Sequence, residues 1–505
     1  MKKILTLLMF VSIFAMALGS PTLNKDYKQY ATTALISPEK AYEMLQNQDN
    51  IVILDTRQKA DFEKGHIEGS LDIWRPQYGA DKGEYEYGGM RGTPEKLEKT
   101  LSAYGITPDM HIILAQSSHD STRLFWLLEM YGHEKINLID GGTTAWKNAG
   151  LPLVTGEAKR LEPSNYEFKN EMNFSKLAKL EDVVAGINDP NVIILDTRTQ
   201  FEHDGLALFA GAFTKGRIPS PYYLEWNKLI NSDRTFKSVE EIEKMLASRG
   251  ITRDKTIISY CQSGVRSAHT TFVLSKLLGW ENVKNYDGSW IEWSYNVVNG
   301  NVENQKDNIV KVIFSYLTNR EKLELVLSML GVWGPLAYIV IFALVTATMI
   351  SVVPVTIAGG IIFGPVTGIL YTAIGAGLGL SLAFLIARYV ARGAIERKFG
   401  NTPAFKKIDE GVKRDGWFIL ATTRLLPIFP FGIQNYVYGL TSIGFVQYAV
   451  LSTIFILPGT SVFVMLAGAF ASGDTKTVVT YSILASLIFF GLMVITKIIK
   501  KKSNM

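Results

Sequence analysis

The chain is poor in cysteine and histidine, and its net charge is small. Its 505 residues include one cysteine and six histidines, and no His/Cys/Asp cluster has the spacing of metal ligands. We therefore expect no metal ion and no other cofactor. The net charge of +5 is small for this length, and no basic patch interleaved with aromatic residues stands out in the polar part. Nucleic acid is therefore not an expected partner. The lack of a second cysteine fits either redox compartment.

The single cysteine, Cys261, follows a predicted strand over 256–260 and precedes a predicted helix over 267–278, with Gly264 and Arg266 between them. Backbone N–H groups of such a turn can converge on an anion, and the following helix places its positive end there. Both effects favour the thiolate, which is the reactive form of cysteine. The alternative is a buried structural cysteine, because free cysteine often packs as a small apolar residue.

The sequence contains a long internal repeat. The segment 51–57 recurs as 192–198, and an Asp-Gly-Gly motif at 140–142 recurs as Asp-Gly-Ser at 287–289. Repetition at this long period indicates two copies of one domain.

The two copies differ at the turn that carries the cysteine. Alignment of the copies puts Ala115 at the position of Cys261, and Asp120 at the position of Arg266. Alanine cannot act as a nucleophile, and aspartate repels an anion. We therefore expect the first copy to be catalytically silent.

Three motifs of the second copy resemble the rhodanese (sulfurtransferase) family: the strand end 195–198, the turn 261–266 and the string 285–293. The likeness to tandem-domain members implies two α/β domains, each with a parallel sheet covered by helices. It also implies that Cys261 takes the outer sulfur of a donor such as thiosulfate and becomes a persulfide. That sulfur then passes to cyanide, a thiol or a protein acceptor. Four residues separate Cys261 from Arg266, whereas a cysteine phosphatase needs five to wrap a phosphoryl group.

The resemblance assigns the site residue by residue. Cys261 is the expected catalytic residue, and the expected substrate-binding residues are Gln262, Ser263, Gly264, Val265 and Arg266. Their N–H groups would stabilise the anionic persulfide, and Arg266 would help to hold an anionic donor. The alternative role of Arg266 is a salt bridge that shapes the turn.

Two departures from the tandem family leave the donor open. An arginine at position 266 is commoner in single-domain members, and Arg217 stands where the family usually has histidine. We expect Asp196 and Arg198 to form a structural ion pair, and His269 to be packed or solvated rather than to act as a base.

The chain begins with two lysines followed by an apolar run over 4–18 and small residues near 17–19, which is the pattern of a signal peptide or an N-terminal anchor. The expected domain order is a signal peptide or anchor over 1–20, an inactive rhodanese-like domain over 21–160, a catalytic rhodanese domain over 161–300, a linker with an amphipathic helix over 301–331, and a membrane domain over 332–499.

The last third of the chain is predicted to be an all-α polytopic membrane domain. Four apolar stretches are near the length that spans a bilayer: 333–352, 366–390, 445–468 and 477–497. Two shorter pieces, 353–365 and 424–435, are broken by proline and glycine. Such pieces in corresponding positions of two halves predict re-entrant segments and an inverted repeat.

This part resembles the DedA/VTT family, also called the SNARE-associated Golgi protein family. The matching residues are Phe363-Gly364-Pro365 and the 375–377 glycine run, then Arg424, Pro427, Pro430 and Asn435. The resemblance implies movement of phospholipids or polyprenyl-phosphate lipids across the membrane. Because a charge inside a membrane segment is costly, Arg424, Pro427, Pro430 and Asn435 form a candidate membrane site. The alternative is that Arg424 caps carbonyls freed by the prolines.

Two sequence patterns make conflicting predictions about the side of the membrane on which the rhodanese copies lie. Basic residues in 391–416 and at the C-terminus place those segments in the cytoplasm, whereas a signal peptide places the rhodanese copies outside. Both hold only if a further segment crosses. We expect an integral protein of a bacterial inner membrane with extracytoplasmic rhodanese domains.

Two functions remain open. The first is a membrane-tethered sulfurtransferase, with a sulfane-sulfur donor, a thiol or cyanide acceptor and membrane lipids as partners. The second is a lipid or solute transporter whose rhodanese pair senses or binds a ligand.

Overall fold

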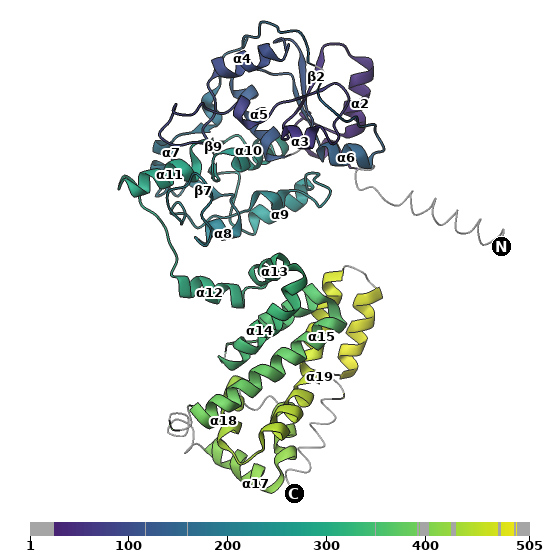
Figure 1. The fold of residues 1–505 in the computed structure, drawn as a ribbon, viewed down its shortest axis with the longest axis vertical. Coiled ribbons are helices and arrows are strands. Elements are labelled where there is room, and N and C mark those ends of the chain that lie inside the picture. The colour runs from purple at the N-terminus through teal and green to yellow at the C-terminus, as the bar shows by residue number, and fades with distance from the viewer. Residues whose placement is uncertain are drawn as a thin grey trace, which may run out of the picture. The chain divides into compact units, whose positions relative to one another are not determined.

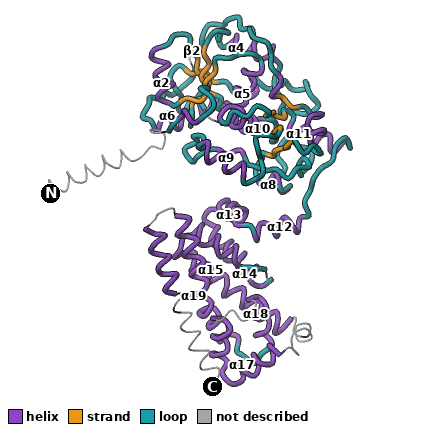
Figure 2. The backbone as a smooth tube through the Cα atoms, turned by 180° about the vertical axis from the view of Figure 1, so that it is seen from behind, coloured by secondary structure: helices purple, strands orange, loops and turns teal. Residues whose placement is uncertain are grey.

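The structure, a computed structural model, describes residues 25–488 and 491, except 117, 159, 349, 391–392, 394–402, 426–430, 473–475. The predicted N-terminal segment 1–20 and the candidate residues Pro427 and Pro430 lie outside this part. The chain divides into two compact units between Asp307 and Asn308 (Figure 1). Figure 2 shows strands in the first unit, whereas the described part of the second unit consists of helices and loops.

The first copy of the repeat is an α/β domain with a five-stranded sheet in the order β1-β5-β4-β2-β3, and every strand pair is parallel. Its strands are β1 (Leu35–Ile36), β2 (Ile51–Asp55), β3 (Ser70–Asp72), β4 (His111–Leu114) and β5 (Ile136–Ile139). Its helices are α2 (Pro38–Asn47), α3 (Lys59–Phe62), α4 (Pro94–Ala103), α5 (His119–Met130) and α6 (Gly142–Asn148), with short 3₁₀ turns at Tyr27–Gln29 and Arg75–Gln77.

The second copy repeats this topology with a four-stranded parallel sheet in the order β6-β9-β8-β7. Its strands are β6 (Leu177–Ala178), β7 (Val192–Asp196), β8 (Thr256–Tyr260) and β9 (Val283–Tyr286). Its helices are α7 (Leu180–Gly186), α8 (Gln200–His203), α9 (Val239–Ala247), α10 (Val265–Phe272) and α11 (Ser289–Val298), with 3₁₀ turns at Phe174–Lys176 and Trp226–Leu229.

The local sequence accounts for these elements. The central strands are apolar and buried, as expected of a parallel sheet that is covered on both faces. Several helices begin at a side-chain cap: Ser37 and Thr93 each precede a proline at the first helical position, and Ser238 forms a capping box with Glu241. Helix α10 begins two residues before the predicted start, because Gly264 takes a left-handed conformation and ends the turn there.

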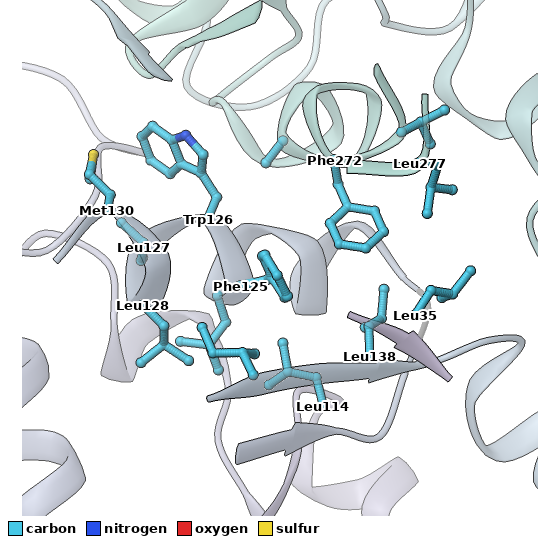
Figure 3. Packing of buried hydrophobic residues seen from close by; sticks show 14 of the residues in the cluster. Leu35, Leu114, Phe125, Trp126, Leu127, Leu128, Met130, Leu138, Phe272 and Leu277 are labelled. Atoms are coloured by element: carbon cyan, nitrogen blue, oxygen red, sulfur yellow. The ribbon is translucent and has the colours of Figure 1, made fainter. Parts of the chain in front are cut away.

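The two copies share one apolar core, in which helices α5 and α10 pack against each other. The rings of Phe125 and Phe272 meet edge to face with centroids 5.0 Å apart. Figure 3 shows Phe125 and Phe272 facing each other from these helices, with Leu114 and Leu138 of the first sheet beneath them. A continuous core means that neither copy buries all of its apolar surface alone.

The second unit is helical and confirms the expected change of fold class. Its described helices are α12 (Ile309–Thr318), α13 (Arg320–Met329), a 3₁₀ turn (Gly331–Trp333), α14 (Gly334–Ala347), α15 (Val353–Leu385) with a π turn at Ile386–Val390, α17 (Pro403–Leu425), α18 (Phe431–Leu440), α19 (Phe445–Ser472) and a last helix over Lys476–Ile488. The segment 301–331, predicted to hold one amphipathic helix, contains two: Asn319 ends α12 and caps α13.

Two of the described helical segments, Val353–Val390 and Phe445–Phe470, are long and apolar enough to cross a membrane, and the bent pair Glu321–Met329 and Gly331–Ala347 could form a third span. The first of these is not straight. Gly364 has φ 76° and ψ 173°, and a Cβ on Gly368 would lie 2.6 Å from the carbonyl oxygen of Gly359. Residues nine apart touch only where the chain reverses, because a straight helix would separate them by about 13 Å. Residues 353–363 and 365–385 therefore form a helical hairpin, and its insertion into a membrane stays a prediction.

Candidate active site

Cys261 lies immediately after β8, at the carboxyl edge of the second sheet, and Gly264 leads directly into α10. The turn reverses direction within four residues because Gly264 has φ +71°, a conformation that side-chain-bearing residues rarely adopt. The carbonyl oxygens of Cys261 and Gln262 accept hydrogen bonds from the N–H groups of Trp290 and Ile291, both at 3.0 Å. The start of α11 thereby holds the outer side of the turn.

The hydroxyl of Ser289 holds the turn from within. Its Oγ accepts hydrogen bonds from the N–H groups of Cys261 at 3.1 Å and Gly264 at 2.9 Å, and it donates to the carbonyl of Tyr286 at 2.7 Å. Ser289 is fully buried and has φ +51°, which is strained for a residue with a Cβ. The strain brings the hydroxyl to a point where one oxygen joins both ends of the turn.

The thiol sulfur has one hydroxyl neighbour, Ser267 Oγ at 3.6 Å. That hydroxyl also lies 2.6 Å from Asn285 Oδ1, while Asn285 Nδ2 donates to the carbonyl of Gly264 at 3.0 Å. Because the Asn285 amide is oriented by Gly264, its oxygen must accept, and Ser267 has only one hydrogen to share between this oxygen and the sulfur. Ser267 can therefore turn toward the sulfur when the sulfur becomes negative.

Charges around the turn favour the thiolate. Burial raises the pKa of the Cys261 thiol, but the Arg266 guanidinium and hydrogen bonds from Ser267 and the turn backbone outweigh it and hold the pKa below its ordinary value. Arg266 also donates to both carboxylate oxygens of Glu202, at 2.6 Å and 2.8 Å. The structure thus shows the salt bridge considered for Arg266, and its role in holding an anionic donor stays a prediction.

The cysteine is covered by loops of both copies and is only 1% exposed. The Gln262 side chain donates to the carbonyls of Phe209 and Ala210 at 3.4 Å and 3.3 Å. On the other side, a Cβ on Gly89 of the first copy would lie 2.7 Å from the Ser263 Cβ. Loops of both copies therefore contact the two residues that follow Cys261.

The other residues singled out in the second copy are structural. Arg198 Nη2 and Asp196 Oδ2 lie 2.8 Å apart, and both residues are buried, as predicted. His269 is fully buried, and Phe236 stacks on its ring. Burial in the first place, and the charge of His119 in the second, lower the pKa of His269 to about 3. Arg217 pairs with Asp307 at 3.0 Å, at the end of the first unit.

The corresponding turn of the first copy has a different chemistry. Ala115 follows β4, and Asp120 lies in the first turn of α5, where Arg75 donates to its carboxylate. Gly142 occupies the place of Ser289 and has φ +58°. A Cβ on Gly142 would lie 2.8 Å from Gln116 Oε1 and 3.1 Å from the Ala115 carbonyl oxygen, so this copy has no room for the serine.

A cavity of about 1000 Å³ lies at the carboxyl edge of the first sheet. Its lining includes Thr56 and Gln116, which follow β2 and β4, and Trp226 of the second copy. Five basic residues also line it, Arg57, Lys64, Arg75, Lys147 and Arg234. The cavity thus lies beside the turn of the first copy that corresponds to the cysteine turn, and its lining also includes the acidic residues Asp61 and Asp120.

In the second unit the structure brings Arg424 and Asn435 together. Arg424 Nη2 donates to Asn435 Oδ1 at 2.7 Å and to the hydroxyl oxygen of Tyr448 at 2.8 Å, and Nη1 donates to Gln434 Oε1 at 3.3 Å. Within the described residues no carboxylate lies within 4 Å of Arg424, so its partners there are neutral oxygens. Pro427 and Pro430 lie outside the described part.

The sequence reasoning missed four residues that build the turn: Ser267, Asn285, Ser289 and Glu202. Asn285 and Ser289 lie inside the motif 285–293. Comparison of the repeats could have pointed to Ser289, because the first copy has Gly142 at that position. Glu202 carried no such signal, because its approach to Arg266 depends on how α8 packs. Groups of three or more His, Cys, Asp or Glu residues that could hold a metal ion are absent from the described part of the chain.

Comparison with known proteins gives two family matches. The rhodanese-like domain model matches residues 37–149 and 179–296, and the VTT domain model matches 350–470. A Mycolicibacterium smegmatis protein named "Putative thiosulfate sulfurtransferase" is 32% identical over 51% of this chain and 94% of its own length. The sulfur carrier protein TtuD of Thermus thermophilus is 31% identical over 46% of this chain and 83% of its own. The wild-type structure of EanB matches with a TM-score of 0.48 and 22% identity, over 55% of this chain and 70% of that one.

Proposed function

The chain belongs to the rhodanese family, with two rhodanese-like domains followed by a VTT domain, and from this premise we propose that it is a membrane-bound sulfurtransferase that works through a persulfide on Cys261. The observation that carries the proposal is the turn at Cys261. A lone, buried cysteine with a lowered pKa lies in a turn that is fixed on every side by hydrogen bonds. A structural cysteine would not need this arrangement.

The reaction proceeds in two displacements. The Cys261 thiolate attacks the outer sulfur of thiosulfate, a new S–S bond forms, and the S–S bond of thiosulfate breaks with its electron pair leaving on sulfite. A thiophilic acceptor such as cyanide then attacks the outer sulfur of the persulfide, and the bonding pair returns to Cys261 as thiolate. The two steps replace one difficult direct transfer. The persulfide is anionic, so the positive charge of Arg266 stabilises it and the N–H groups of the turn can do so too.

The test uses the fact that the chain has one cysteine. After exposure to thiosulfate, mass spectrometry of the intact protein should show one added sulfur atom, which cyanide should remove as thiocyanate. Cys261→Ser should show neither the added mass nor thiocyanate formation, with an unchanged circular dichroism spectrum. Sulfur transfer by the serine variant at a rate comparable to wild type would refute the mechanism.

The VTT domain supports a second part of the proposal, that the membrane unit handles a lipid with an anionic headgroup through Arg424. Among the described residues its guanidinium contacts neutral oxygens and aromatic rings and has no carboxylate partner. Its positive charge is therefore not neutralised there and can attract a phosphate. Arg424→Ala should slow lipid translocation in reconstituted vesicles. Arg424→Lys should recover part of it, because an ammonium does not reproduce a bidentate fork. The exposed Lys476→Ala serves as the charge-matched control, and normal translocation by Arg424→Ala would favour a purely structural role.

A second candidate function is a lipid or solute transporter whose rhodanese pair senses a ligand. The basic cavity at the edge of the first sheet favours it, since that copy has a binding-sized space but no nucleophile. Binding of thiosulfate that alters translocation by the Cys261→Ser protein would support this function, provided that wild type forms no persulfide.

We also propose that the protein resides in a bacterial inner membrane with its rhodanese copies outside the cytoplasm. The exposed Lys40 allows a test in a Cys261→Ser background. A Lys40→Cys substitution should react with a membrane-impermeant maleimide in intact spheroplasts. Labelling only after lysis would place the copies in the cytoplasm.

A further inference from the structure

One side chain of the inactive copy ends at the candidate catalytic turn of the other copy. Arg123, on α5 of the first copy, donates from Nη1 to the carbonyl oxygen of Gly264 at 3.2 Å and from Nη2 to the carboxylate of Asp287. The Arg123 side chain is 3% exposed and that of Asp287 is 4% exposed. A buried guanidinium is costly unless its partners satisfy it, so this contact between the copies is specific.

We propose that Arg123 is a positioning residue through which the inactive copy sets the geometry of the Cys261 turn in the active copy. This inference rests on the proposed sulfurtransferase function and adds to it a reason why a copy without a nucleophile is needed. Arg123 touches neither the sulfur nor the donor, and it acts through Gly264 and Asp287.

The first path of this effect is the peptide between Gly264 and Val265. A peptide is planar, with its C=O and N–H pointing in opposite directions. The carbonyl of Gly264 is held by Arg123 on one side and by Asn285 Nδ2 at 3.0 Å on the other. The N–H of Val265 must therefore point away from both donors. A third donor, the N–H of Ala268 in α10, reaches the same oxygen at the longer distance of 3.3 Å. Glycine allows many backbone orientations, so loss of Arg123 should loosen this peptide rather than release it.

The second path runs through Asp287 to Ser289. The carboxylate of Asp287 accepts from Arg123 and from the backbone N–H of Arg91 at 3.2 Å, and both donors belong to the first copy. Two residues further on, Ser289 carries the hydroxyl that joins Cys261 to Gly264. The first copy thus fixes the segment that carries the Ser289 hydroxyl, although it makes no hydrogen bond to the Cys261 sulfur.

The side-chain part of this support runs in one direction only. The position equivalent to Arg123 in the second copy is His269, since each lies eight residues after its turn position, Cys261 or Ala115. His269 is packed against aromatic rings and makes no hydrogen bond in the described structure. The equivalent of Asp287 in the first copy, Asp140, accepts from the backbone N–H of Phe236 of the second copy at 2.8 Å, as Asp287 does from Arg91, but its side-chain partner is Lys25 rather than an arginine of the other copy. The arginine is therefore a specific adaptation of the inactive copy.

The full-length protein allows a direct test with a matched control. Arg123→Met removes the guanidinium and leaves an unbranched apolar side chain in its place. Arg123→Lys keeps a positive charge that can reach one acceptor. Glu129→Gln removes two other ion pairs between the copies, with Lys176 and Lys276, from the same helix α5. It does so without contact to the turn, so it measures the effect of weakened docking alone.

Two readouts separate positioning from general support. The first is kcat and KM for thiosulfate cyanolysis, and the second is the pH dependence of iodoacetamide alkylation, which reports only Cys261. We expect Arg123→Met to lower kcat by about ten-fold or more, on the scale of a disturbed anion-stabilising geometry, and to move the alkylation profile to higher pH. Arg123→Lys should lie between Met and wild type. Glu129→Gln should lower the denaturation midpoint and leave both readouts at wild-type values.

Each outcome either supports or refutes the positioning role of Arg123. If Arg123→Met and Arg123→Lys keep wild-type kcat and alkylation profiles, Arg123 only stabilises the interface and the inference is wrong. Should Arg123→Met fail to fold, the profile of Arg123→Lys decides alone. If wild type forms no persulfide, the proposed function fails, but the alkylation profile still shows whether Arg123 sets the properties of Cys261.

Discussion

The two rhodanese copies have the same strand order but opposite charge at the end of the turn. In the second copy Arg266 faces the turn and is paired with Glu202, while in the first copy Asp120 takes that place and is paired with Arg75. Each of these two side chains has an oppositely charged partner, so the fold accommodates a positive or a negative residue at this position. Only the second arrangement adds a positive field at the residue that follows the strand. The comparison teaches that the chemistry of this fold depends on a few turn residues that folding itself leaves free to change.

A second difference lies in the residue that fixes the turn. Ser289 holds a strained left-handed conformation and joins two N–H groups, whereas Gly142 adopts a similar φ without strain and offers no hydroxyl. Strain that persists in only one of two homologous sites indicates a local function. The first copy, which has Ala115 in place of the cysteine, has no such strain at this position.

The largest expected effect comes from an attempt to move the chemistry between the copies. In a Cys261→Ser background, Ala115→Cys should give no detectable persulfide and no cyanolysis. The new thiol would have Asp120 in place of Arg266 and no hydroxyl at position 142 to fix its turn. Intact-protein mass spectrometry after thiosulfate treatment measures this. A persulfide on the introduced thiol would show that the nucleophile alone distinguishes the copies.

The next effect concerns Ser289. Ser289→Gly converts the second copy to the residue of the first, and Ser289→Ala removes the hydroxyl but keeps the strain. Both should lower kcat by roughly 100-fold, the scale for loss of a group that organises anion stabilisation. They should differ in stability, because glycine relieves a left-handed conformation that costs roughly 1–2 kcal/mol. Urea denaturation should therefore rank Ser289→Gly above Ser289→Ala, and equal midpoints would argue against strain at this position.

A smaller effect is expected from the charge at position 266. The pKa of Cys261 lies below its ordinary value although burial raises it, and Arg266 is the main cause that lowers it. The thiolate reacts, so the alkylation rate falls as the pH drops through this pKa. Arg266→Gln should move that acid limb to higher pH, while Glu202→Gln, which keeps the arginine, should not. An unchanged limb in Arg266→Gln would leave the turn N–H groups as the main stabilisers of the thiolate.

The sequence predicted what depends on local pattern, and missed what depends on docking. The strand predicted over 256–260 is β8, because its apolar run is bounded by clear turn residues. The duplication and the change to an all-helical unit were also readable from repeats and hydropathy. Arg123 could not be found, since its partners Gly264 and Asp287 are more than a hundred residues away. The left-handed φ of Ser289 could not be predicted either, because in a sequence only glycine indicates such a conformation.

The smallest expected effect compares the two positions eight residues after the turn, His269 and Arg123. Burial, and then the charge of His119, lower the pKa of His269 to about 3, from an unfolded value near 6.5. Between these values the unfolded chain binds a proton that the folded protein does not. Stability should therefore fall as the pH drops below about 6.5, by at most about 1.4 kcal/mol per pH unit from this group.

His269→Phe keeps an aromatic ring against Phe236 and removes two buried nitrogens that have no partner. Urea midpoints of the first unit, expressed as residues 25–307, should then differ little between variant and wild type at pH 8 and more at pH 5. His133 also has a pKa lowered by burial, to about 4, so part of the acid sensitivity should remain in the variant. If wild type and His269→Phe lose stability in parallel on acidification, His269 takes up no proton on unfolding in this range, and the acid sensitivity belongs to other groups.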